Sequence, residues 1–120
     1  MVSHWMAWIS VIFSILLLLK FAVRKCRIKK LNRIFSRLHE SFAIIMFAAG
    51  LVHAIIVLSR STYFGTGIIS GILVLISALC VFLTCIHRKN HLKTWMKMHR
   101  IGTVTFAGCL WAHLVLIHAI

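Results

Sequence analysis

The sequence predicts an all-α membrane protein, folded as a four-helix transmembrane bundle. Hydrophobic residues make up 62% of its 120 residues and charged residues only 12%, whereas about a quarter of the residues in soluble proteins are charged. Four apolar segments reach the roughly 20 residues with which an α-helix crosses a bilayer. Proline is absent and the connections are short, so we expect one membrane domain over residues 1–120.

The four spans are predicted at residues 4–23, 38–59, 66–86 and 99–120. The first, HWMAWISVIFSILLLLKFAV, could be taken for a signal peptide, but the basic residues follow it and do not precede it. This order favours a helix that is retained in the mature protein. The third span is a generic apolar helix like the first, whereas the second and fourth each contain a pair of histidines fourteen residues apart.

The net charge of +13 is concentrated in the first and third connections between the spans. By the positive-inside rule these connections are cytoplasmic and both termini lie outside, and we expect the bacterial cytoplasmic membrane. The cations would contact lipid headgroups, and no nucleic-acid-binding motif accompanies them. The basic residues are Arg24, Lys25, Arg27, Lys29, Lys30, Arg33 and Arg37 in the first connection, and Arg88, Lys89, Lys93, Lys97 and Arg100 around the third.

A shift of 60 positions places the second span over the fourth without a gap. RIFSRLH (33–39) then lies over KTWMKMH (93–99), and the two histidines of one span lie over those of the other. Identities elsewhere are few. A helical hairpin of about 60 residues, used twice, is the interpretation we favour.

The histidine spacing predicts two haem sites. Fourteen residues correspond to about 21 Å along a helix and to faces within about 40° of each other. Spans two and four run in the same direction, so His39 and His99 share one depth, and His53 and His113 another. Neutral imidazole is a standard axial ligand of haem iron. One interfacial histidine is most often just an amphipathic residue, but four at matched spacing indicate an inner His39–His99 pair and an outer His53–His113 pair.

Other residues near these histidines are candidates for holding the haem periphery. Cations and hydroxyls would bind the propionates, and small residues would leave space for the ring, although small residues also serve close helix packing. The propionate candidates are Arg37, Lys97 and Arg100 for the inner haem, and Arg60 with Ser61 and Tyr63 for the outer one. The small residues are Gly50 and Gly108, with Ala48, Ala49, Ala107 and Cys109.

The histidines, together with RLHESF and KMHRIG, resemble the diheme transmembrane cytochromes b. These include the haem core of ferric reductases and NADPH oxidases and that of quinol-oxidising cytochrome b. The resemblance covers spans two and four, and it implies two non-covalent b haems, with His39, His53, His99 and His113 as iron ligands. The chain has neither a GxGxxG dinucleotide signature nor the quinone loop of the quinol-oxidising family.

We therefore expect transmembrane electron transfer by a subunit or partner of an oxidoreductase, not a complete enzyme. A redox protein or a quinone would exchange electrons with it, in a hetero- or homo-oligomer. One alternative is a small four-helix transporter, but proton-coupled carriers need an acid within the membrane, and the only acidic residue, Glu40, lies at an interface. The other is an assembly subunit without a cofactor.

The remaining histidines and the cysteines are expected to have lesser roles. His87 and His91 could bind a metal if a third ligand were supplied, although headgroup contact is the interpretation we favour. His118 is the best replacement ligand should His113 fail. Cys26, Cys80, Cys85 and Cys109 have no redox or haem-attachment spacing and are expected to act as small hydrophobes.

Overall fold

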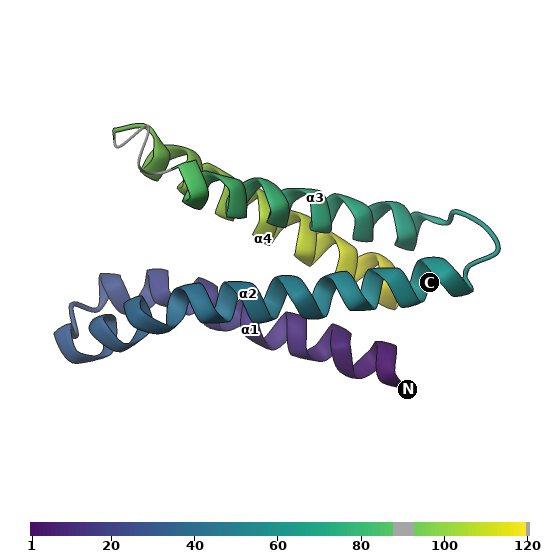
Figure 1. Cartoon of the computed structure of the whole chain (residues 1–120), viewed down its shortest axis with the longest axis horizontal. Helices are drawn as coiled ribbons and strands as arrows, with labels where there is room; N and C mark the ends of the chain where they lie inside the picture. The colour runs from purple at the N-terminus through teal and green to yellow at the C-terminus, as the bar shows by residue number, and fades with distance from the viewer. Residues whose placement is uncertain (88–92, 120) are drawn as a thin grey trace. The chain divides into compact units, whose positions relative to one another are not determined.

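The structure, a computed structural model, describes residues 1–87 and 93–119 and is almost entirely helical. Its helices are α1 (Val2–Lys25), α2 (Lys29–Arg60), α3 (Thr66–Ile86) and α4 (Trp95–Ala119) (Figure 1). Each is long and apolar enough to cross a membrane, and the described residues include no strand. The prediction of an all-α integral membrane protein is confirmed.

The helix ends follow from local sequence. Helix α1 ends at Lys25. Arg27 follows with a left-handed backbone, at a φ of 56°, and α2 begins two residues later. Gly65 precedes α3, and its carbonyl accepts hydrogen bonds from the amides of Ile68 at 3.0 Å and Ile69 at 3.2 Å. The bounds of α3 match the predicted span. Helix α2, in contrast, begins nine residues before the predicted span, because lysine and arginine are good helix formers even though residues 29–37 are too basic for the hydrocarbon core.

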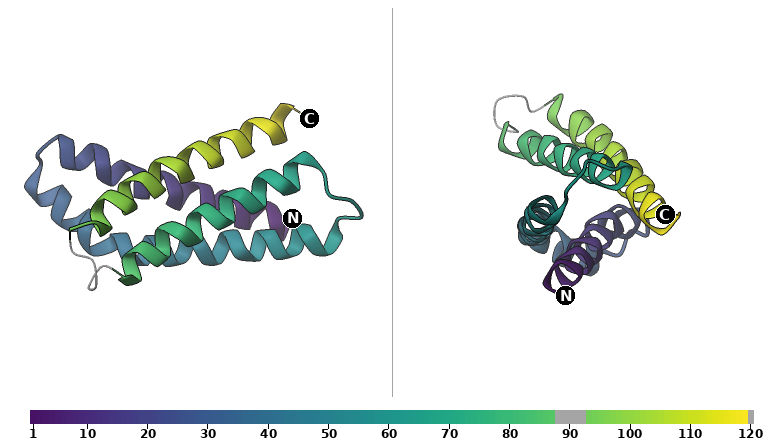
Figure 2. Two further views of the ribbon diagram at one scale, coloured as in Figure 1. Left: turned by 90° about the horizontal axis from the view of Figure 1, so that it is seen from above. Right: turned by 90° about the vertical axis from the view of Figure 1, so that its right-hand side faces the viewer.

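The chain separates into two compact units, Met1–Ile56 and Val57–Ile120. We call them the first and second hairpins, because each consists mainly of two antiparallel helices: α1 with α2, and α3 with α4 (Figure 2). Only a few side chains are buried within them, among them Met46 in the first and Phe106 in the second. Most apolar side chains face outward, as expected for helices surrounded by lipid.

The two helices of the second hairpin keep one constant register. Ser70 contacts His113, Thr84 contacts His99, and a Cβ at Gly102 would touch Val81. In all three pairs the residue numbers add up to 183. The contacts therefore follow one straight antiparallel interface from end to end.

The first hairpin keeps a different register. Ser3 contacts His53 and Ser10 contacts the carbonyl of Met46, pairs whose numbers add up to 56. Phe13 and Phe42 pack edge to face nearby, with ring centroids 5.3 Å apart. If the first hairpin repeated the contacts of the second with both residue numbers lowered by 60, the numbers in each pair would add up to 63. Relative to that repeat, α1 is displaced along α2 by seven residues, about two helical turns.

Candidate functional site

His113 lies on α4 with its imidazole against α3. Its Nδ1 atom is 2.8 Å from the hydroxyl oxygen of Ser70, a side chain that is only 8% exposed. The ring also lies over Gly71, where an added Cβ would come within 3.1 Å of the His113 Cε1 atom. Any larger residue at position 71 would crowd the imidazole, so the glycine is what lets the ring approach α3.

His99 occupies the other end of the same interface. Its Nδ1 atom is 3.2 Å from the hydroxyl oxygen of Thr84 and 3.4 Å from the sulfur of Cys85. Trp95, one turn earlier on α4, places its ring centroid 6.0 Å from that of the imidazole. Cys85 was expected to be only a small hydrophobe, and the structure places its sulfur beside a predicted ligand.

His53 has a corresponding environment in the first hairpin. Its Nδ1 atom lies 3.0 Å from the hydroxyl oxygen of Ser3 and also 3.0 Å from the main-chain carbonyl oxygen of that residue. Ser3 is the second residue of α1. The ring of His53 is thus held by the start of the preceding helix, as the ring of His113 is held by α3.

His39 is half-buried on α2 and shares a face with His53. The buried Met46 lies midway between them, seven residues from each. Seven residues bring a helix to within about 20° of two complete turns, so the three side chains form one stripe. His99, Phe106 and His113 form the corresponding stripe on α4, with Phe106 buried.

Hydroxyl side chains form a matching stripe on the helix that faces each histidine stripe. On α3 these are Ser70, Ser77 and Thr84, spaced by seven residues. Each donates its hydroxyl proton to the carbonyl three residues earlier, at 3.0, 2.8 and 2.6 Å respectively. On α1, Ser3 and Ser10 have the same spacing. Each hairpin therefore places a stripe of histidine, large apolar residue and histidine against a stripe that contains hydroxyls.

The two glycines proposed to make space for a ring have different surroundings. A Cβ at Gly50 would lie 3.2 Å from the Ser10 hydroxyl, so this glycine lets α1 and α2 pack closely, which was the alternative role expected for small residues. Around Gly108, apart from its chain neighbours and the adjoining backbone of α4, no described atom lies within 4 Å of the position of an added Cβ. Its side of α4 is therefore turned away from α3.

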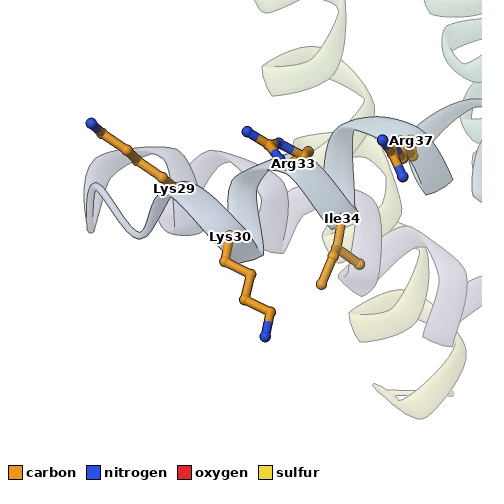
Figure 3. Close-up of a pocket in the computed structure, with 5 residues that line it drawn as sticks. All are labelled: Lys29, Lys30, Arg33, Ile34 and Arg37. Carbon is orange, nitrogen blue, oxygen red and sulfur yellow. The ribbon is translucent and has the colours of Figure 1, made fainter.

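The inner cations are exposed in the N-terminal parts of α2 and α4. Arg37 borders an open hollow on α2 together with Lys29, Lys30, Arg33 and Ile34. The charged ends of these side chains point in different directions and do not converge on one point (Figure 3). On α4, Lys97 and Arg100 flank His99 in sequence and are likewise exposed. This arrangement suits contact with several headgroups or with a broad anionic surface.

Arg60 belongs to a second open hollow, within the second hairpin. Polar side chains from the end of α2, the connection and the start of α3 surround it, and the lining residues are Arg60, Ser61, Thr62, Tyr63, Gly65, Thr66, Gly67 and Ile68. The predicted outer cluster of Arg60, Ser61 and Tyr63 is thus brought together around one surface depression. All three side chains are exposed.

Among the remaining histidines, His4, His87 and His118 lie in the described part of the chain. His87 donates from Nδ1 to the carbonyl of Leu83 at 2.9 Å and is exposed, whereas His91, its predicted partner, lies outside the described residues, as do Arg88 and Lys89. His118 is exposed near the end of α4.

The hydroxyl residues that contact the histidines, Ser3, Ser70 and Thr84, were not predicted from the sequence, although the spacing of two of them was a signal. Ser70 and Thr84 are fourteen residues apart, as are His99 and His113, and antiparallel helices with equal spacings can match both pairs at once. In the first hairpin no equal spacing reveals Ser3. Its contact depends on the register of α1 against α2, which the sequence pattern does not specify.

The chain was also compared with known proteins. No family model, no curated protein and no solved structure matches it.

Proposed function

We propose that this protein carries electrons across a membrane through two b haems, each bound by a pair of histidines. His39 and His99 would hold the inner haem, and His53 and His113 the outer one. The observation that carries the proposal is the histidine stripe, which recurs on α2 and α4 with the same fourteen-residue spacing. When bound, haem iron supplies one-electron redox chemistry, and two imidazoles leave it no open coordination position.

The chemistry of the histidine environments supports this assignment. Histidines that bind a metal through one ring nitrogen almost always donate a hydrogen bond from the other. Three of the four proposed ligands, His53, His99 and His113, have Nδ1 within hydrogen-bonding distance of an oxygen on the neighbouring helix. Coordination through Nε2 would leave these bonds in place, so the donor set fits haem.

The exposed cations have supporting roles in this proposal. Arg37, Lys97 and Arg100 would bind the propionates of the inner haem, and Arg60 those of the outer one. As an electron-transfer subunit or partner of an oxidoreductase, the protein would exchange electrons with a redox protein or a quinone.

Haem content tests the proposed function directly. We expect the chain, purified in detergent from haem-sufficient cells, to contain two b haems per polypeptide and to give a reduced-minus-oxidised spectrum of the b type. Absorbance and a protein assay on one sample measure the ratio. A colourless preparation from such cells would contradict the proposal and favour a transporter or an assembly subunit.

The proposed orientation, with basic connections in the cytoplasm, is tested through Cys26. This cysteine is exposed between α1 and α2. In a chain whose other three cysteines are replaced by serine, a membrane-impermeant maleimide should label Cys26 in inverted vesicles but not in intact cells, because the reagent reaches only the exposed side. The matched control is Cys26→Ser with Ser61→Cys, in the connection between α2 and α3, which should show the opposite pattern. Labelling of Cys26 from outside would reverse the topology.

A further inference from the structure

The hydrogen bonds around Ser70 determine which atom carries the proton between it and His113. A serine hydroxyl has one proton to donate. Ser70 directs that proton to the carbonyl of Gly67 at 3.0 Å. Its oxygen must therefore accept the 2.8 Å hydrogen bond that joins it to Nδ1 of His113, so Nδ1 carries a hydrogen.

The same reasoning applies to His99. Thr84 donates its only hydroxyl proton to the carbonyl of Val81 at 2.6 Å. Across the 3.2 Å contact with Nδ1 of His99, the threonine oxygen can then only accept. Nδ1 of His99 is then the donor, and the sulfur of Cys85, 3.4 Å from the same nitrogen, is a second and weaker acceptor of its proton.

For His53 the acceptor is a carbonyl. The main-chain oxygen of Ser3, 3.0 Å from Nδ1 of His53, has no proton to give, so Nδ1 is the donor in this bond. The hydroxyl oxygen of Ser3, also 3.0 Å from Nδ1, is then a second acceptor of the same proton. Three histidines on two helices are thus assigned the same tautomer by three separate sets of bonds. In a neutral imidazole protonated at Nδ1, the lone pair that can bind a metal is on Nε2.

We infer that Ser70, Thr84 and the main-chain carbonyl of Ser3 are positioning groups that fix His113, His99 and His53 as Nδ1–H tautomers with Nε2 as the iron-binding atom. The assignment of the iron rests on the proposed function, whereas the assignment of the tautomers does not. A hydroxyl that already donates one bond is polarised and accepts a second more strongly. Ser70 and Thr84 would therefore also raise the basicity of the ligands they hold.

Nuclear magnetic resonance of the full chain tests the tautomers. With ¹⁵N-labelled histidine in lipid nanodiscs, measured with and without added haem, we expect His53, His99 and His113 to show Nδ1–H signals in the haem-free sample. Ser70→Ala should alter the ring signals of His113 and leave those of His99, whereas Thr84→Val should do the reverse. Nε2–H tautomers for these rings in the unmodified chain would overturn the inference.

Haem binding by the same variants tests the positioning role. We expect Ser70→Ala to weaken retention of one haem by about tenfold or more and to shift its midpoint potential upward, because a less basic imidazole stabilises ferric iron less. Ser70→Thr, which keeps the hydroxyl, should restore both values. The matched control is Ser77→Ala: Ser77 lies on the same stripe of α3 and has the same type of back-bond, to Val74, but the register places it opposite Phe106.

The outcomes separate this inference from the proposed function. Suppose that the unmodified chain binds haem, and that Ser70→Ala has no larger effect than Ser77→Ala on the His113 tautomer, on haem retention or on the midpoint potential. Ser70 is then not a positioning residue. If the Nδ1–H tautomers are found but no haem is bound at any concentration, the proposed function fails and the tautomer assignment stands.

Discussion

Replacing His113 with alanine is expected to reduce the haem bound per chain from two to one, with the inner haem's spectrum retained. In the proposed function, the alanine would remove one of the two imidazoles that hold the outer haem, and a single histidine would hold iron less firmly than a pair. His53→Ala should give the same result, because it would remove the other proposed ligand of the same haem. Haem content and low-temperature spectra of the reduced protein measure the loss.

The control for this prediction is His118→Ala. His118 lies on the same helix, five residues beyond His113, and is exposed. We expect this variant to keep both haems. Two unchanged haems in His53→Ala would contradict the pairing of His53 with His113, and a loss in His118→Ala would point to His118 as the ligand on α4.

Inserting one alanine into α4 between Thr105 and Phe106 is expected to remove at least one haem. The insertion turns everything beyond it by about 100° and moves it by about 1.5 Å. His99 and His113 would then leave their common face, and only one of them could keep its contact with α3. Haem content per chain and circular dichroism measure ligation and helix content together.

An insertion at another point of α4 provides the control. One alanine between Leu116 and Ile117 lengthens the helix beyond both histidines and leaves their spacing unchanged, so both haems should remain. Retention of two haems in the Thr105–Phe106 insertion, with helix content equal to the control's, would contradict the requirement for a common histidine face.

In both hairpins a serine contacts Nδ1 of a histidine, but the two serines do not lie over each other when the sequence is shifted by 60 positions. Ser10 is the counterpart of Ser70 after a shift of 60, yet it contacts the carbonyl of Met46, whereas Ser3 contacts His53. The displacement of α1 by seven residues accounts for this difference. Ser3 and Ser10 are seven residues apart, so Ser3 lies opposite His53, where an exact repeat would place Ser10. The displacement also lengthens the connected end of the first hairpin, where the basic residues 29–37 begin α2.

The sequence by itself determined the helices and the spacing of the histidines. A run of about 20 apolar residues must satisfy its backbone hydrogen bonds internally, and a helix does so, which is why the spans could be predicted and why the bounds of α3 agree with the structure. The fourteen-residue spacing likewise follows from the chain alone, since helical geometry converts it into depth and direction. The pairing of histidines around two haems remains a prediction from that spacing and from the family resemblance.

The tertiary structure decided what each imidazole contacts. Periodicity specifies the face of a helix but not its register against a neighbour, because register depends on which side chains interlock across the interface. The contact between His53 and Ser3 requires α1 to lie seven residues from where the repeat would place it, and the contact between His113 and Ser70 requires the glycine at position 71 to admit the ring. The bonds that assign the tautomers therefore come from packing between helices, which a one-dimensional pattern does not contain.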